Sequence, residues 1–328
     1  MTRRTASLLA RPMTTVSLCF LIACGGGSGS DSGTGQAPGS SSGSGGDDAA
    51  GGSPPGADAS PVGVSDDGGA DAGSTDGARP DASGGTTGEA GATDGGLNPH
   101  VAPGGNFDLT IWELQEPVGS AGSPTTYSPA QLEGPNGHQD AYFFTDPTDG
   151  SMTFWDPENG VTTANSMYPR SELREMTSAG AAANWPTTGT NTLSATLKAT
   201  VVPDHVCVGQ IHLGTGTPAS TKPLLELFYF PSGSIVMAIE QTPAGGNEVQ
   251  TPVGNVPLGT KWSYVIGLSG NTISLVINGG SPQTFSMSST FDQENMYFKA
   301  GDYDQSVGSS STIGAKVQFS ALEVHHGP

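Results

Sequence analysis

The chain has 328 residues and a net charge of −20 at pH 7, with 31 Asp and Glu against 11 Lys and Arg. This acidic balance argues against nucleic acid as a partner, because phosphate contacts need a basic surface. Of the three cysteines, Cys19 and Cys24 lie near the start and Cys207 stands alone in the C-terminal region, which excludes a disulfide within that region. Cys207 lies between two valines, so we expect a small core residue; a catalytic thiol is the lesser alternative.

Residues 1–23 have the organisation of an export signal. A basic start precedes an apolar run at 16–23, which is too short to span a bilayer as a permanent helix. The run ends in Leu21-Ile22-Ala23-Cys24, which resembles a bacterial lipobox. We therefore expect cleavage before Cys24, a lipid on Cys24, and attachment to the bacterial cell envelope at the outer membrane or cell surface. The alternative is an ordinary secretory signal and a released protein.

Residues 24–97 form a linker composed almost entirely of Gly, Ser, Ala, Asp, Thr and Pro, with no aromatic residue. Such a segment buries too little apolar surface to offset its chain entropy, so we expect it to be disordered. Its eleven acids against the single base Arg79 should extend it further by self-repulsion. As a flexible coil it would reach roughly 45 Å, enough to hold a domain clear of a membrane.

Residues 98–328 have the size of a single domain, and their pattern predicts an all-β fold. Apolar and polar residues alternate with period two, most clearly at 192–201 and 272–278. Asn278-Gly279-Gly280 then predicts a hairpin turn into a strand at 283–285. Further strands are expected at 107–114, 141–144, 152–155, 168–176, 206–213, 224–230, 234–239, 262–268, 296–305 and 316–324. Many short strands separated by turn residues predict a jelly-roll sandwich of two antiparallel sheets, a fold that does not name a function by itself.

The first unusual strand is Arg170-Ser171-Glu172-Leu173-Arg174. Because strand side chains alternate, Arg170, Glu172 and Arg174 should share one face. One interpretation is a solvated face with a ladder of ion pairs. The other is a cleft floor in which Glu172 holds two guanidinium groups ready for an anion, since the planar fork of Arg binds a carboxylate at two points.

Two further segments place polar side chains on one strand face. In Gln210-Ile211-His212, the Gln and the His should share a face while Ile211 points into the core. In the segment 297–305, Tyr297, Lys299, Gly301, Tyr303 and Gln305 should share a face. Gly301 should leave room for the close approach of a ligand or of another backbone. An amphipathic strand is the simpler alternative for this segment, but its face mixes Tyr, Lys and Gln with few apolar side chains.

Together the three strands should form a concave substrate groove for an acidic sugar polymer. Aromatic rings stack on pyranose faces, cations hold carboxylates, and a His with a Tyr supplies titratable protons. The blocks Arg-Ser-Glu-Leu-Arg, Gln-Ile-His and Tyr-Phe-Lys-Ala-Gly-x-Tyr-x-Gln, in this order, resemble the three signature blocks of the family 7 polysaccharide lyases. These are alginate lyases with a β-jelly-roll fold. The segment 107–115 resembles the start of their domain, so the likeness covers about 98–328.

The resemblance implies cleavage of alginate, a polymer of mannuronate and guluronate, by β-elimination at the 4-O-linkage, giving C4–C5 unsaturated oligosaccharides. Arg170, Gln210 and His212 would neutralise the uronate carboxylate, so that the C5 proton can leave. His212 would be the base for guluronate. Tyr303 would protonate the leaving oxygen and could serve as both base and acid for mannuronate.

The remaining site residues are implied as substrate-binding. Arg174 and Glu172 would shape the site, and Lys299 and Gln305 would bind neighbouring sugars. Tyr297 belongs to the same groove face. No cofactor and no metal are expected, because Arg and Gln occupy the role that a cation fills in other lyases. The expected partner is the acidic polysaccharide, bound by a monomer.

Asp302 and Asp304 depart from the family pattern, which has apolar or neutral residues there. By strand parity both should point away from the groove. The segment 98–328 also carries a net charge of −13, which should slow the encounter with a polyanion at low salt. Positive charge local to the groove would make activity salt-sensitive.

Two alternatives remain from the sequence. One is a non-catalytic carbohydrate-binding lipoprotein, which needs groove residues but no titratable pair such as His212 and Tyr303. The other is a lyase for a different polyuronate, such as a glucuronan, which the motifs do not exclude.

Overall fold

The computed structural model describes residues 96–164, 166–214 and 222–328. The chain divides into two units, Met1–Ser83 and Gly84–Pro328, and the described residues all lie in the second. The export signal, Cys24 and nearly all of the linker lie outside the described residues. Within the described part, no helix is long and apolar enough to cross a membrane.

Two sheets form the described part, and all their strand pairings are antiparallel. The larger sheet has the order β11 (Val249–Asn255), β10 (Ser234–Ile239), β9 (Pro223–Tyr229), β8 (Val206–Leu213), β15 (Asn295–Asp304), β5 (Ser171–Glu175), β1 (Trp112–Ser120) and β2 (Ser123–Tyr127), with β6 (Trp185–Pro186) paired to β15. The smaller sheet has the order β14 (Gln283–Ser286), β13 (Thr272–Ile277), β12 (Trp262–Ser269), β7 (Thr190–Val201), β16 (Gly314–Gly327), β4 (Met152–Pro157) and β3 (Phe143–Thr145). A short helix, α1 (Pro129–Leu132), and a 3-10 turn, η1 (Ser289–Phe291), lie in the connections.

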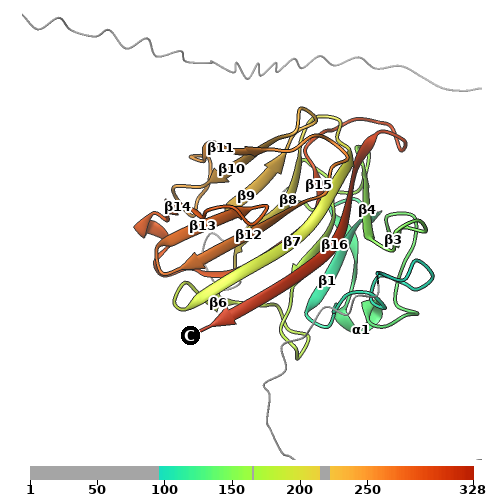
Figure 1. Ribbon diagram of the computed structural model, residues 1–328, viewed down its shortest axis with the longest axis horizontal. Coiled ribbons are helices and arrows are strands. Elements are labelled where there is room, and N and C mark those ends of the chain that lie inside the picture. Colours follow the sequence, from blue (N-terminus) through green and yellow to red (C-terminus); the bar gives the residue numbers. More distant parts are fainter. Residues whose placement is uncertain (1–95, 165, 215–221) are drawn as a thin grey trace, which may run out of the picture. The chain divides into compact units, whose positions relative to one another are not determined.

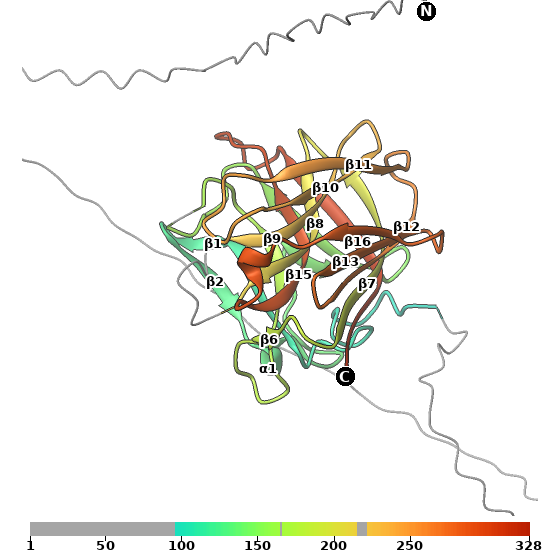
Figure 2. The ribbon, with the colours of Figure 1, turned by 90° about the vertical axis from the view of Figure 1, so that its left-hand side faces the viewer.

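The sheets pack face to face over one core, as a jelly roll requires. In the smaller sheet the long strands β7 and β16 run side by side (Figure 1), and β8, β9 and β10 adjoin one another in the larger sheet (Figure 2). The alternation is confirmed over 192–200, since Leu193 and Leu197 are buried while the intervening polar residues are not. Val201, expected on the buried face, is instead 43% exposed at the end of β7. Ile211 of β8 joins Leu193 and Leu197 in the same core cluster. The expected all-β sandwich is therefore confirmed.

The expected strand at 107–114 differs from the structure, in which β1 begins at Trp112. The carboxylate of Asp108 accepts hydrogen bonds from the backbone and the hydroxyl of Thr110, at 3.1 and 2.5 Å. The backbone N–H of Trp112 then donates to the carbonyl of Leu109 at 3.1 Å. These local bonds turn the chain, so Leu109 reaches the core from a turn instead of from a strand.

The edge strand β11 was not expected from the sequence. Its residues are mostly exposed, so apolar and polar residues do not alternate along it. It also includes Pro252, which has no backbone N–H to donate to a neighbouring strand. It is held by pairing with β10, a contact that no local pattern reveals.

Cys207 is free and fully buried, as expected of a packed residue. It lies in a second cluster with Phe228, Val236 and Ala238, against which Tyr303 packs. The ring of Tyr303 therefore has an apolar packing surface on its own sheet.

Candidate active site

The groove lies on the face of the larger sheet that turns away from the core. On β5, Leu173 belongs to the core while its neighbours Glu172 and Arg174 line the groove. The groove encloses about 580 Å³. All nine substrate and catalytic residues expected from the sequence line it: Arg170, Glu172, Arg174, Gln210, His212, Tyr297, Lys299, Tyr303 and Gln305.

Strand register aligns polar side chains across the groove floor. Gln210 of β8 is the register partner of Lys299 of β15, and Lys299 is in turn the partner of Arg174 of β5. The row continues to Glu226 of β9 on one side and to Glu113 of β1 on the other. Because directly paired residues point to the same face, five strands contribute one continuous polar row.

Glu172 is the centre of the site. Its side chain is fully buried, and Oε1 accepts a hydrogen bond from Nε2 of Gln210 at 2.5 Å. Oε2 accepts from Nη1 of Arg170 at 3.3 Å and from Nζ of Lys299. A buried carboxylate is costly unless it is paired, so these donors compensate it. The carboxylate in turn holds all three donor side chains in place.

Close approach of strands makes this geometry possible. Gly301 of β15 is the register partner of Glu172 and has a φ of +151°. A Cβ atom at Gly301 would lie 2.8 Å from the Cα of Glu172 and from the carbonyl oxygen of Ser171. The expectation of close approach is confirmed, and the approaching group is the neighbouring backbone.

The hydroxyl groups of Tyr303 and Ser166 form a hydrogen bond, with 3.1 Å between Oη and Oγ. The guanidinium carbon of Arg170 lies 3.8 Å from the centre of the Tyr303 ring, and Nη2 of Arg170 donates to the same Ser166 hydroxyl at 3.2 Å. Burial raises the pKa of Tyr303, although the charge of Arg170 acts in the opposite direction. The phenol therefore keeps its proton at neutral pH and can act as an acid.

His212 is held in one tautomer. Its Nδ1 lies 3.0 Å from the backbone carbonyl of Leu213, and because a carbonyl only accepts, Nδ1 must carry the proton. Nε2 is then left with a lone pair. Burial, and next the charge of Lys299, lower the pKa of His212 to about 3, so the imidazole is neutral at physiological pH. A neutral imidazole with a free lone pair can accept a proton.

Arg174 supplies a cation without a carboxylate partner among the described residues. Its guanidinium carbon lies 4.4 Å from the centre of the Tyr297 ring, and the ring centres of Tyr297 and His212 are 5.0 Å apart. Stacking on an aromatic face leaves the outer N–H groups of an Arg available for an anion. This corner of the groove suits a carboxylate ligand.

The combination of a jelly-roll groove with these side chains agrees with the comparison to known proteins. A family model described as alginate lyase matches residues 107–326. The chain belongs to the alginate lyase family.

Solved and characterised relatives support the same membership. An alginate lyase of Klebsiella pneumoniae is 27% identical over 282 residues, which are 69% of this chain and 92% of that protein. The crystal structure of alginate lyase A1-II', a member of polysaccharide lyase family 7, is 34% identical with a TM-score of 0.61, over 69% of this chain and 99% of that one. Alginate lyase PA1167 from Pseudomonas aeruginosa is 33% identical with a TM-score of 0.61, over 67% and 99%. The expected family is confirmed, and the protein is a polysaccharide lyase.

Several groove residues of this alginate lyase family member were missed from the sequence. Ser166 and Tyr168 come from the connection before β5, which begins at Ser171 and not at 168 as expected. The parity of the expected strand would have put Tyr168 on the face of Arg170, whereas no periodicity marks Ser166. Glu226 of β9 faces the groove, and burial followed by the charge of Glu248 raises its pKa to about 7. An acid within the apolar run 224–230 was the available signal for Glu226.

Lys299 lies deeper than a residue dedicated to neighbouring sugars would. It is 6% exposed, and burial followed by the charge of Arg170 lowers its pKa to about 8. Its Nζ is bonded to Glu172, so it supports the groove floor, while contact with a neighbouring sugar stays a prediction. Gln305, at the end of the same segment, donates from Nε2 to the carbonyl of Tyr303 at 3.1 Å.

Asp302 and Asp304 point away from the groove, as strand parity predicts, and both are fully buried. Asp304 accepts from the backbone and the hydroxyl of Ser306, at 3.0 and 2.6 Å. Its own N–H donates to Asp156 on β4 of the other sheet at 3.0 Å. In the part of the chain that the structure describes, neither carboxylate oxygen of Asp302 has a hydrogen-bond partner. These acids therefore lie between the sheets and do not repel a substrate at the groove surface.

A second hollow, of about 660 Å³, lies over β7, β12 and β16 of the smaller sheet. Its lining is mostly Ser, Thr, Gly and aliphatic residues, with Asp108 and Glu323 as the acids and neither His nor Lys nor Arg. It lacks a His and Tyr pair such as His212 and Tyr303. The groove of about 580 Å³, which holds that pair, is therefore the candidate active site.

Proposed function

We propose that this lyase cleaves alginate by β-elimination in the groove, with His212 and Tyr303 as the proton-transfer pair. The supporting observation is their complementary protonation, a neutral imidazole that accepts and a neutral phenol that donates, on one groove face. A1-II' has been solved with a product (GGG) and with a substrate (GGMG). In the substrate complex that protein carries asparagine in place of a histidine and phenylalanine in place of a tyrosine.

The reaction requires loss of a weakly acidic proton. Arg170 and Gln210, oriented by Glu172, would donate hydrogen bonds to the C5 carboxylate and stabilise the enolate-like intermediate. Nε2 of His212 would take the C5 proton of guluronate. The electron pair forms the C4–C5 double bond as the C4–O bond breaks, and the leaving oxygen takes the proton of Tyr303. Proton transfer with solvent then restores both side chains.

For mannuronate the C5 proton lies on the opposite face of the sugar. We propose that Tyr303 serves there as both base and acid. For that role Tyr303 first gives its proton to solvent, and the charge of Arg170, stacked on its ring, favours the resulting phenolate. The phenolate would take the C5 proton and then pass it to the leaving oxygen as the C4–O bond breaks. Arg174 and Tyr297 would bind the carboxylate and the face of an adjacent sugar, and Lys299 and Gln305 would contact further sugars.

The test is an initial-rate assay of absorbance from the C4–C5 double bond on four polymers in parallel. These are alginate, polymannuronate, polyguluronate and glucuronan. A rate on alginate and its block polymers supports the proposal. Binding of alginate without new absorbance would instead support a carbohydrate-binding lipoprotein, and a rate on glucuronan alone would assign a different polyuronate.

We further propose that the protein acts as a monomer, exported and anchored by a lipid on Cys24. The support is the segment Leu21-Ile22-Ala23-Cys24 and the low-complexity linker that follows it. Changing Cys24→Ser should move the protein from the membrane to the soluble fraction, because the lipid is the anchor in this proposal. A variant that still sediments with membranes would contradict it. Light scattering of the released protein tests the monomer.

A further inference from the structure

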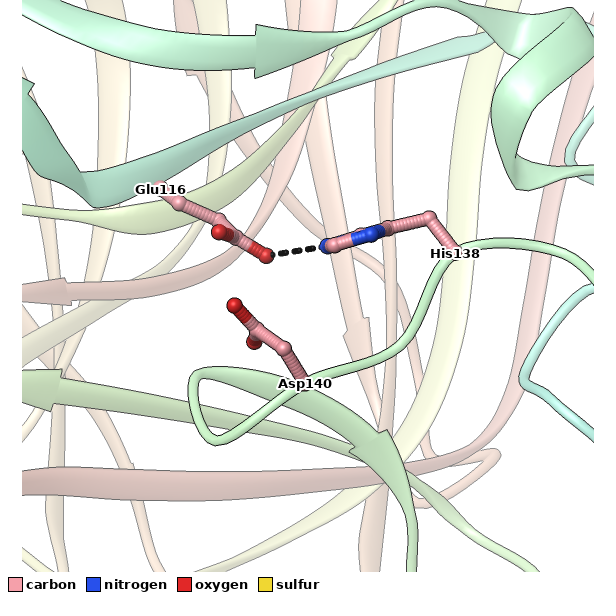
Figure 3. A group of neighbouring side chains, drawn as sticks. All are labelled: Glu116, His138 and Asp140. Carbon is pink, nitrogen blue, oxygen red and sulfur yellow. Dashed lines mark hydrogen bonds and ion pairs between the residues drawn. The ribbon is translucent and has the colours of Figure 1, made fainter. Parts of the chain in front are cut away.

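Three side chains of types that can bind a metal meet outside the groove, on the other side of β1. Glu116 comes from β1, and His138 and Asp140 come from the segment between α1 and β3; Figure 3 shows them turned toward one another. Each offers a ligand atom within 4.8 Å of the other two. On β1, Glu113 and Gln115 line the groove, so by alternation Glu116 faces the opposite side.

Glu116 has an unexplained buried oxygen. The residue is 0% exposed, Oε1 lies 2.8 Å from Nε2 of His138, and Oε2 has no hydrogen-bond partner among the described residues. A buried carboxylate oxygen without a partner is unfavourable, because the hydrogen bonds it made to water are not replaced. Figure 3 shows the carboxylates of Glu116 and Asp140 facing each other beside the imidazole. An ion between them would satisfy this oxygen.

The three groups are held in place before any ion binds. The ring of His138 stacks on Tyr127, with 3.5 Å between ring centres and 13° between planes. Oδ1 of Asp140 accepts from the backbone N–H groups of Tyr142 and Phe143, at 2.7 and 3.1 Å. Backbone bonds and ring stacking of this kind orient metal ligands.

The local charge favours a cation. Within the described part of the chain, neither Glu116 nor Asp140 forms an ion pair with a Lys or an Arg.

We propose that Glu116, His138 and Asp140 bind a divalent transition-metal ion of the zinc class. One imidazole and two carboxylates suit such an ion better than Mg²⁺ or Ca²⁺, which prefer oxygen ligands alone. Asp140 is exposed, so water can enter and complete the coordination. The ion would tie the segment before β3 to β1, and it takes no part in the groove chemistry.

The test measures zinc bound by the full chain. After treatment with a chelator, the wild type, Glu116→Gln and His138→Asn are dialysed against Zn²⁺, and bound metal is quantified. The matched control is His205→Asn, since His205 also pairs with an acid, Asp204, but at the surface. We expect both site variants to lose one equivalent of zinc, with affinity falling at least about tenfold, while the control keeps it.

A thermal measurement makes the test independent of the variants' folding. Zn²⁺ should raise the Tm of the wild type and of the His205→Asn control, because an ion that binds only the folded state stabilises it. Equal zinc content in wild type and site variants, or no rise in wild-type Tm, would overturn the proposal. Stabilisation by Ca²⁺ equal to that by Zn²⁺ would overturn the assignment to the zinc class.

Discussion

Burial imposes on His212 and Tyr303 the protonation states that the proposed cleavage of guluronate requires. Desolvation disfavours the charged form of either side chain, so the imidazole loses its proton and the phenol keeps its own. The carbonyl of Leu213 additionally selects the tautomer of His212. Two residues with ordinary roles in most proteins thus become an acceptor and a donor through their surroundings.

Removal of the Tyr303 hydroxyl is the sharpest residue-level prediction. Tyr303→Phe keeps the ring that packs on Cys207 and Arg170, so fold and substrate binding should persist. Turnover should fall about 10²–10⁴-fold, since the leaving oxygen loses its proton donor. Initial absorbance rates and a separate binding measurement check this. The control is Tyr142→Phe, at a tyrosine that does not line the groove. If Tyr303→Phe turns over as fast as this control, Tyr303 is not part of the mechanism.

His212→Asn separates the two block polymers. Asn can still donate a hydrogen bond to a carboxylate but cannot take a proton, so polyguluronate cleavage should fall about 10²-fold or more. Polymannuronate cleavage should fall much less, because Tyr303 is the proposed base for that sugar. Parallel initial rates on the two polymers measure the ratio. An equal loss on both would assign His212 the same role for each.

At the scale of the element, the two faces of β15 have different surroundings. Tyr297, Lys299 and Tyr303 line the groove, while Asp302 and Asp304 lie between the sheets. Burial, and next the charge of Asp156, raise the pKa of Asp302 well above its usual range. The inner face of β15 therefore carries a carboxyl group whose protonated form is favoured by burial.

Asp302→Asn should change how stability depends on pH. In the unfolded chain Asp302 loses its proton near its usual pKa, whereas the folded state retains the proton to higher pH. The contribution of Asp302 to the wild-type free energy of unfolding is therefore present at low pH. It declines as pH rises, by roughly 1 kcal/mol per pH unit. Asn does not ionise, so the variant should gain on the wild type as pH rises above about 4, the usual pKa of an Asp, as measured by urea unfolding. Parallel curves over that range would show that Asp302 ionises freely.

At the scale of the molecule, a group of cationic side chains lies in the groove of an acidic protein, beside groove acids such as Glu113 and Glu226. The chain carries −20 overall, yet Arg170, Arg174 and Lys299 gather on one face of one sheet. Long-range repulsion opposes the approach of a polyanion, and the groove attracts it only at short range.

Added salt should therefore accelerate encounter before it weakens binding. Raising ionic strength from about 10 mM to about 150 mM shortens the Debye length from about 30 Å to about 8 Å. The repulsion is then screened while close groove contacts persist, so kcat/KM on alginate should rise and then decline at higher salt. A monotonic fall from the lowest salt would mean that the groove charge governs approach as well as binding.

Much of this protein was determined by local sequence alone. Period-two alternation identifies strands because side chains on a pleated strand point alternately to two faces. The same parity correctly placed Glu172 and Arg174 on one face, Ile211 in the core, and Asp302 and Asp304 away from the groove. Composition and family motifs were sufficient for the class of enzyme.

Only the tertiary structure decided which partners these side chains meet. Glu172 gathers donors from β8 and β15, more than thirty residues away in sequence, because strand register aligns them. Glu116 and His138 meet across 22 residues, and Ser166 reaches Tyr303 across 137. The pKa values of His212 and Tyr303 follow from burial that arises only when the sheet assembles, so no local pattern contains them.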